Sequence, residues 1–414
     1  MTAVKPSNIG GAMQARSIRR IRQFFLAVAL SSPVAGNAQG VVNNILLQWR
    51  EQTDKCEEST QPDDGAMVGV AMFEAINAIA GKYTPYVATI SAARGSSMDA
   101  AAAQAAHDVL VKVCPDMQSA FDGALKTSLA LVKDSVSREN GVAVGKQAAA
   151  AVIAARASSK ADIKDPVMTP TTAGAYVPTI RRVGTTWAQQ TPWIMKAPDE
   201  VRPSPPPPLT SAIWRRDLAE IREMGARKAK ARSPDQNDIG QFWANKDVRI
   251  VLRQLVGLRG RSLVDDARFL ALAEMAWADS YVAMMDGKYA YNFWRPITAL
   301  RNAGMVPGDS AAGDVAWEPM VNTPPHPEYP CGHCLSAGAV GTVIAEEFGE
   351  EFPSILLDME KSLLRRYHSA QEYIDDVTES RILAGVHYRF SANAGRDAGV
   401  RVGKLAVERY FKRK

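Results

Sequence analysis

The sequence predicts an all-α protein built of helical bundles. Alanine-rich segments such as "AAAAQAAHDVLVKV", from Ala100, place apolar residues at helical spacing. Several segments begin with residues that cap helices, and convincing alternating strand patterns are absent. With 414 residues the chain is long enough for two or three domains or one large one.

Composition excludes some classes of function. A formal net charge of +5 over 414 residues is too dilute to indicate a nucleic-acid-binding protein. No apolar run reaches the roughly 18 residues that a membrane-spanning helix needs. We therefore expect neither a nucleic-acid partner nor a spanning segment.

Residues 1–38 have the parts of an export signal. Four arginines between residues 16 and 22 precede a short apolar run from Phe24, and small residues follow up to Ala38. We expect cleavage after Ala38 and a periplasmic or extracellular location; the alternative is a basic amphipathic first helix. In an oxidising compartment Cys56 and Cys114 could pair.

Three further regions follow this segment. Residues 39–160 read as an N-terminal helical layer, which includes a second alanine-rich helix from Val142. Residues 161–209 lose the helical pattern and end in the stiff "RPSPPPPL", which predicts an irregular connector. Residues 210–414 read as a C-terminal helical bundle.

Two helices of the C-terminal bundle have readable beginnings. Ser233 offers an N-cap, followed by a proline and, at the third helical position, a glutamine. Ser262, with Asp265 three residues later, opens a segment that is apolar almost all round. This second segment predicts a central, buried helix.

The segment "KYAYNFWRP" carries two cations. Lys288 and Arg295 are seven residues apart, which on a single helix is two turns and the same face, so both could reach one anion. The alternative is a pair of long side chains whose charged ends reach solvent at a helix end.

The segment "PEYPCGHCLSAGAVG" reads as a proline turn that opens into an apolar helix near His333. Free N–H groups at a helix start favour an oxyanion, Gly332 allows close approach of the backbone, and His333 could transfer protons. The alternative is a histidine that merely caps the helix.

The segment "SRILAGVHYRFSANAG" adds Arg381 and His387. Six residues do not align on one helical face, so Arg381 would have to reach round to meet His387. The alternative is a histidine satisfied within the core.

Taken in order, K-x6-R-P, P-x-G-H and S-R-x5-H resemble the signature shared by vanadium-dependent haloperoxidases and type-2 phosphatidic acid phosphatases. The resemblance runs from "AMFEAINAIAGKYTPY", from Ala71, to "HYRFSANAG" and is closest to the soluble bacterial haloperoxidase-like branch. It implies a haloperoxidase-like helical fold with an oxyanion site in the C-terminal four-helix bundle.

The resemblance also implies roles for individual residues around vanadate, or around phosphate in the same site. His387 would bond to the central atom, as a ligand of vanadium or as a nucleophile toward phosphorus, and His333 would be the general acid or base. The implied oxyanion-binding residues are Lys288, Arg295, Cys331, Gly332 and Arg381.

Two departures concern the groups around the anion. Cys331 stands where the family has serine, and a thiol donates weakly to an oxyanion and is open to oxidation by peroxide. Ser391 stands where the family has an acidic residue four positions after the last histidine. The partner that orients His387 is therefore missing or comes from elsewhere.

The halide preference rests on one further position. His326 stands where resembling bromoperoxidases have histidine, so we expect it on the halide side of the site and favour bromide. Met285 matches neither the chloroperoxidase nor the bromoperoxidase pattern at its position.

Cys331 and Cys334 form a C-x-x-C like that of thiol–disulfide enzymes. Thiol–disulfide catalysis as the main function is disfavoured, because that motif needs a preceding strand and a βαβ setting. The two cysteines could close a disulfide that switches activity, but we favour two unpaired thiols.

The sequence thus predicts a vanadate-dependent haloperoxidase-like enzyme that oxidises halide with hydrogen peroxide to hypohalous acid. One alternative is a soluble acid phosphatase that hydrolyses a phosphoester through phosphohistidine at His387. A second is an oxyanion binder without catalysis. A homodimer is possible by analogy.

Overall fold

The computed structural model describes residues 44–57, 62–157, 172–178, 182–244, 246–258, 260–306, 313–349, 352–359 and 363–414. The expected export signal, residues 1–38, and part of the expected connector lie outside these residues. All the described residues belong to one compact unit, residues 40–414.

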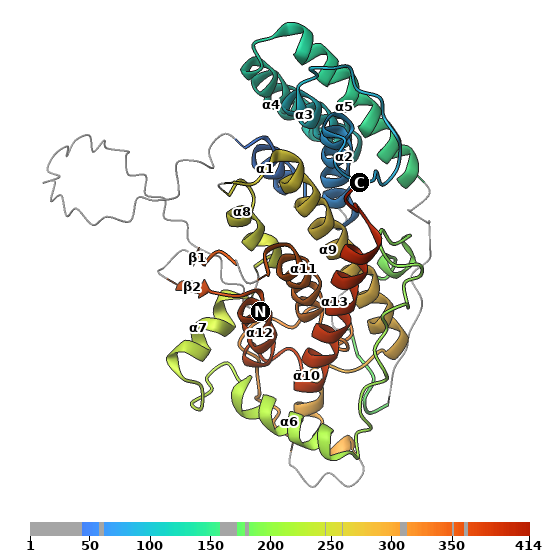
Figure 1. The fold of residues 1–414 in the computed structure, drawn as a ribbon. Helices are drawn as coiled ribbons and strands as arrows, with labels where there is room; N and C mark the ends of the chain where they lie inside the picture. Colours follow the sequence, from blue (N-terminus) through green and yellow to red (C-terminus); the bar gives the residue numbers. More distant parts are fainter. Residues whose placement is uncertain are drawn as a thin grey trace, which may run out of the picture. The chain divides into compact units, whose positions relative to one another are not determined.

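The described residues are mostly helical, as the sequence predicts (Figure 1). The N-terminal helices are α1 (Ile45–Glu57), α2 (Pro62–Ala80), α3 (Met98–Val113), α4 (Gln118–Leu131) and α5 (Ser135–Arg156). The middle helices are α6 (Ala212–Met224), α7 (Pro234–Phe242) and α8 (Leu252–Leu255). The C-terminal helices are α9 (Leu263–Tyr291), α10 (Pro296–Arg301), α11 (Gly332–Phe348), α12 (Ala370–Leu383) and α13 (Arg389–Arg409). Short 3-10 turns are η1 (Pro115–Met117), η2 (Trp187–Gln189), η3 (Val248–Val251) and η4 (Ala303–Met305).

Both helix starts read from the sequence are confirmed. Ser233 caps α7 in a complete capping box, in which its hydroxyl accepts from the Gln236 N–H and the Gln236 side chain accepts from the Ser233 N–H. Ser262 caps α9, and its hydroxyl also donates to the Asp265 carboxylate at 2.7 Å. Local hydrogen bonds decide these positions, which explains why the sequence alone locates them.

Helix α9 is the central, buried helix that its apolar pattern predicts. It packs against α2 of the N-terminal layer and against α11 and α13 of the C-terminal bundle. One continuous apolar core therefore joins the two halves of the chain, with Phe73 on α2 and Phe269 on α9 both fully buried. None of the helices in the described ranges combines the length and hydropathy needed to cross a membrane.

Small residues let α13 approach α11 closely. A β-carbon at Gly399 would lie 2.0 Å from the carbonyl oxygen of Leu335, and one at Gly395 would lie 2.4 Å from that of Cys331. Glycine is therefore required at both positions, because any side chain would push the helices apart. This contact holds the start of α11 beside the start of α13.

A small hairpin departs from the all-helical expectation. Strand β1 (Ile355–Met359) pairs antiparallel with β2 (Leu363–Tyr367), with Ile355 opposite Tyr367. Buried Ile355 and Leu357 alternate with exposed neighbours in β1. Five residues are too few for this alternation to stand out in the sequence.

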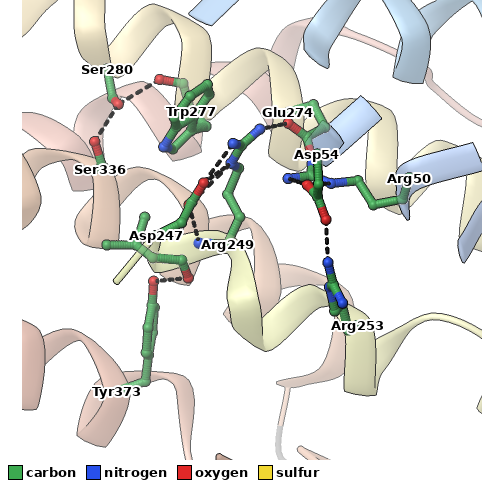
Figure 2. A network of polar contacts seen from close by, with 11 residues as sticks. Arg50, Asp54, Asp247, Arg249, Arg253, Glu274, Trp277, Ser280, Ser336 and Tyr373 are labelled. Atoms are coloured by element: carbon green, nitrogen blue, oxygen red, sulfur yellow. Dashed lines mark hydrogen bonds and ion pairs between the residues drawn. The ribbon is translucent and has the colours of Figure 1, made fainter. Parts of the chain in front are cut away.

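A buried network of charges ties α1 and η3 to α9 (Figure 2). The Glu274 carboxylate, on α9, accepts a hydrogen bond of 2.7 Å from a terminal nitrogen of Arg249 and also forms an ion pair with Arg50 of α1. Arg249 also donates to Asp247 and lies over the Trp277 ring, 3.4 Å from its centroid. Burial is the largest single effect and would raise the pKa of Asp247, but the charges of Arg249 and Arg50 and the hydrogen bonds from Arg249 together lower it to about 2.

Candidate active site

Lys288 and Arg295 lie on different helices. Lys288 is in the last turn of α9, Asn292 ends that helix in the left-handed conformation (φ 46°), and Arg295 is the N-cap of α10, just before Pro296. The expectation that the two cations share one face of one helix is therefore wrong. They come together because the chain turns at Asn292.

Both cations reach the segment that precedes α11. The Lys288 ammonium donates to the carbonyl oxygens of Pro327 and Glu328 at 2.8 and 2.7 Å. The Arg295 guanidinium donates through Nε to the His326 carbonyl at 3.0 Å, and its second terminal nitrogen lies 3.0 Å from His326 Nδ1. His326, the expected halide-side residue, thus sits directly beside Arg295.

Arg381 and His387 are joined by the turn that ends α12. The His387 N–H donates to the Arg381 carbonyl at 3.3 Å, which brings the two residues together although they do not share a helical face. The Arg381 guanidinium is anchored by a 2.9 Å hydrogen bond to the Trp243 carbonyl. Its Nε is buried and has no hydrogen-bond partner within the described part of the chain.

The start of α11 supplies backbone donors. Cys331 is the N-cap, so the N–H groups of Gly332 and His333 precede the first intrahelical hydrogen bonds. A β-carbon at Gly332 would lie 2.1 Å from the sulfur of Met284, so any side chain here would require the Met284 side chain or the start of α11 to move. His333 follows with a partly exposed side chain.

Glu328 orients His387. The Glu328 carboxylate accepts from His387 Nδ1 at 2.8 Å and from the Tyr388 N–H at 3.2 Å. With its proton on Nδ1, the imidazole presents the lone pair of Nε2, which lies 3.3 Å from an Arg295 terminal nitrogen. Glu328 therefore fixes which nitrogen of His387 faces the cations.

The sequence did not indicate which residue orients the His387 ring. In the structure this residue is Glu328. Ser391, at the position of the family's acidic residue, is fully buried. Its hydroxyl makes no hydrogen bond of regular geometry within the described residues, although it lowers the pKa of the Glu328 carboxyl. The one local signal for Glu328 is a charged residue set among prolines in "PPHPEYP".

Burial and mutual repulsion shift the pKa values of the three cations. Burial, and then the charge of Arg295, hold the pKa of Lys288 well below its usual value. The pKa of Arg295 falls to about 10 through burial, and that of Arg381 falls to about 9 through burial and the charge of Arg295. Three buried cations that repel one another form a site that favours an anion.

The pKa values of the histidines in the site fall, whereas the pKa of Glu328 rises. Burial and the nearby arginines hold the pKa values of His333 and His387 well below the usual range, so both rings are neutral at pH 7. Burial raises the pKa of Glu328 to about 7, even though Lys288 and Arg295 oppose that shift. His326 is also neutral, because burial and then Lys288 lower its pKa.

Cys331 is not an oxyanion donor in this structure, and the preference for unpaired thiols is wrong. A disulfide joins Cys331 to Cys334 across a Cα–Cα distance of 5.4 Å, so neither sulfur carries a hydrogen. The Cys331 N–H is also used, since it donates to the Ser391 carbonyl at 3.3 Å. A second disulfide joins Cys56 to Cys114, the pairing that the sequence allows.

The donors that remain suit a tetrahedral oxyanion such as vanadate or phosphate. Lys288 keeps one of its three N–H groups after its two carbonyl contacts, and the buried Arg381 Nε needs an acceptor. The first N–H groups of α11 add the positive end of the helix dipole. Over the described ranges, no cluster of three or more His, Cys, Asp or Glu residues could hold a metal cation.

Comparison with known proteins finds similarity to vanadium haloperoxidases. A family model described as the VCPO second helical-bundle domain matches residues 268–413. The vanadium chloroperoxidase of Curvularia inaequalis is 28% identical over 181 residues, a match that covers 32% of this chain. The C-terminal part of the chain is therefore similar to the second helical-bundle domain of vanadium chloroperoxidases. The chain spans 29% of the length of that curated relative.

Solved structures of bacterial haloperoxidases share the fold over most of the chain. The first bacterial vanadium-dependent iodoperoxidase superposes with a TM-score of 0.73 at 20% identity, covering 90% of this chain and 96% of that one. A holo-type bacterial vanadium-dependent chloroperoxidase superposes with a TM-score of 0.65 at 18% identity, covering 91% and 94%. The haloperoxidase-like helical architecture expected from the motifs is thus confirmed.

Proposed function

We propose that this protein is a member of the vanadium haloperoxidase superfamily and works as a vanadate-dependent haloperoxidase that oxidises halide, with bromide favoured, to hypohalous acid. The observation that carries the proposal is the orientation of His387, whose neutral ring presents Nε2 to a cluster of three buried cations. Vanadate would be held by Lys288, Arg295 and Arg381, by the N–H of Gly332 and by His387. In such a site vanadate supplies the transfer of an oxygen atom from hydrogen peroxide to a halide ion.

The residues of the chain would prepare this chemistry in three ways. The cations and the start of α11 neutralise the charge of the oxyanion and would stabilise a more highly charged transition state. Glu328 holds the His387 proton on Nδ1 and so keeps Nε2 free for the central atom. His333, neutral at pH 7, can take a proton from hydrogen peroxide at its arrival.

His326 supports the bromide preference. Its neutral ring lies against Arg295, where a halide could be oxidised at the rim of the cation cluster. Replacing His326 by phenylalanine is expected to raise the ratio of chloride to bromide oxidation. An unchanged ratio would show that the halide is selected elsewhere.

An acid phosphatase could use the same geometry, with Nε2 of His387 attacking phosphorus. Assays on one purified sample distinguish a peroxidase, a phosphatase and a non-catalytic binder. Bromide- and peroxide-dependent bromination of a phenol dye that requires orthovanadate would support the peroxidase. Hydrolysis of p-nitrophenyl phosphate that orthovanadate inhibits would support the phosphatase instead. Oxyanion binding without either activity would leave a non-catalytic binder.

The expected export signal is part of the same proposal. The two disulfides, Cys56–Cys114 and Cys331–Cys334, support folding in an oxidising compartment. Mass spectrometry of the secreted protein should then find a chain that begins at Gln39. A chain retained in the cell with its first 38 residues intact would contradict export.

A further inference from the structure

A cavity of about 250 Å³ adjoins the candidate active site. Arg295, which contacts both His326 and His387 in the site, also lines this cavity. The other walls come from the segment around Tyr176, from α10 and from the chain between Glu318 and Pro325. A molecule in the cavity would therefore lie next to the site where the proposed oxidation takes place.

The charged groups of the cavity are mainly positive. Arg227, Arg295 and Arg301 line it, together with a single carboxylate, Glu318. Arg227 pairs with Glu318 at 3.1 Å, but both side chains are about half exposed, at 52% and 54%, so their attraction is weak. Arg295 is committed to the oxyanion site.

Arg301 is the cation most available to a ligand. Its Nε donates to the Trp317 carbonyl at 3.1 Å, and the described part of the chain offers no partner to its terminal nitrogens. Planar guanidinium groups hold carboxylates with two parallel hydrogen bonds. The cavity thus has one cation placed to receive a carboxylate.

The remaining walls combine polar Thr298, Asn322 and Thr323 with apolar groups against which an aromatic ring could pack. Tyr176 is 4% exposed, Ile297 lies on α10, and three prolines complete this side of the cavity. Tyr176 and Arg295 both line the cavity. Burial raises the pKa of Tyr176, and the nearby charge of Arg295 partly opposes this shift. A volume of 250 Å³ is below the usual range for drug-sized ligands and suits a molecule with one ring.

We propose that this cavity binds the organic substrate and selects a single-ring aromatic anion, whose carboxylate pairs with Arg301 and whose ring packs against Tyr176 and the prolines. The proposal rests on the proposed haloperoxidase function for its chemistry. A ring held there would meet hypobromous acid as it forms: a C–H bond breaks, a C–Br bond forms, and the released proton joins hydroxide to give water.

Binding can be tested without vanadate, peroxide or halide. We expect 4-hydroxybenzoate to bind the whole protein in a calorimetric titration, and 4-hydroxybenzyl alcohol, its neutral analogue, to bind at least tenfold more weakly. Arg301→Gln should weaken 4-hydroxybenzoate binding about three- to fivefold, because Arg301 is exposed and an exposed ion pair contributes up to about 1 kcal/mol. Its effect on the neutral analogue should be small.

Two matched variants separate charge from structure. Arg301→Lys keeps the charge but cannot make two parallel hydrogen bonds, so its affinity for 4-hydroxybenzoate should lie between those of the unmodified protein and Arg301→Gln. Arg215→Gln removes another exposed arginine that donates to a backbone carbonyl, that of Thr210, and it should leave binding unchanged. Equal binding of the anion and its neutral analogue, or full affinity in Arg301→Gln, would overturn the proposal.

Turnover then distinguishes this proposal from the proposed function. If the protein brominates, Arg301→Gln should raise KM for 4-hydroxybenzoate about three- to fivefold and leave kcat and bromide oxidation unchanged. An unchanged KM would overturn the assignment of the cavity as the substrate site. Selective binding of the anion without any bromination would contradict the haloperoxidase but leave a binding site for aromatic anions.

Discussion

Glu328 is the buried carboxylate that controls the orientation of His387. We expect Glu328→Gln to lower kcat about 10- to 100-fold, the usual effect of losing a partner that orients a ligating histidine. Anion affinity should not fall in proportion, because the same change removes a negative charge from beside Lys288 and Arg295. Steady-state kinetics and sulfate titrations measure the two effects separately.

A second variant tests whether the position of this carboxylate matters. In Glu328→Gln with Ser391→Asp, a carboxylate returns four residues after His387, at the position where the resembling family carries one. Partial recovery of kcat is expected. A proportional loss of activity and sulfate affinity in Glu328→Gln, without recovery in the double variant, would mean that Glu328 only supports the fold.

The pKa shifts in the site predict how anion binding depends on pH. Burial and Arg295 lower the pKa of Lys288, and burial raises that of Glu328 to about 7. A bound dianion favours the protonated form of both groups, so binding takes up protons and affinity must fall as pH rises.

Sulfate suits this measurement because it stays a dianion between pH 6 and pH 9. Its Kd should rise across this range, and calorimetry in buffers of different ionisation enthalpy should show proton uptake. Lys288→Arg should reduce the slope, since arginine stays charged throughout. A Kd that is constant with pH in the unmodified protein would contradict these assignments.

Helix α11 depends on Gly332 for its approach to α9. Gly332→Ala would place a β-carbon in contact with the Met284 sulfur, so either this buried methionine or the start of the helix must shift. We expect sulfate affinity to fall about tenfold and the free energy of unfolding to fall by about 1–3 kcal/mol. Titration and urea denaturation measure the two changes.

Gly123, on α4, provides the matched control, because a β-carbon at this position would have no neighbouring atom within 4 Å. Gly123→Ala should leave binding unchanged and stabilise the protein by up to about 1 kcal/mol. If both alanine variants behaved alike, the close contact at Gly332 would not position the anion site.

Sequence patterns over a few residues predicted where helices begin better than they predicted how residues on different elements are placed relative to one another. The caps at Ser233 and Ser262 depend on residues three positions apart, so the sequence alone locates them. The seven-residue spacing of Lys288 and Arg295 wrongly predicted one shared helical face, because a turn at Asn292 ends the helix between them. The β1–β2 hairpin was missed because each strand has five residues and no long alternation.

For the whole compact unit, Glu274 links the N-terminal layer to the central helix (Figure 2). Glu274 is 1% exposed and pairs with Arg249 and Arg50. Glu274→Gln leaves two buried guanidinium groups without this countercharge, and we expect it to lower the free energy of unfolding by about 3–5 kcal/mol. Urea denaturation measures the loss.

Glu379 is the control, because it also pairs with an arginine, Arg389, but both of these side chains are about 30% exposed. Glu379→Gln should cost no more than about 1 kcal/mol. Equal losses in the two glutamine variants would show that burial does not set the strength of these ion pairs.

The order of the three motifs predicted which parts of the chain meet, and the structure brings Lys288, Arg295, Arg381, His333 and His387 into one region. It could not predict that Glu328 would replace the acidic residue missing at Ser391, because that contact spans 59 residues and depends on how the helices pack. Nor could it decide the state of Cys331 and Cys334, since two cysteines three residues apart fit both thiols and a disulfide.

The Cys331–Cys334 bond changes what peroxide would meet in this protein. Under the proposed function, a free thiol beside the anion would be oxidised by hydrogen peroxide, and each turnover would risk inactivating the site. With both sulfurs already bonded to each other and fully buried, the N-cap of α11 offers peroxide no nucleophile. Under the proposed function, a disulfide at the position where the resembling family has serine costs the site one donor to the anion but protects this position from oxidation by hydrogen peroxide.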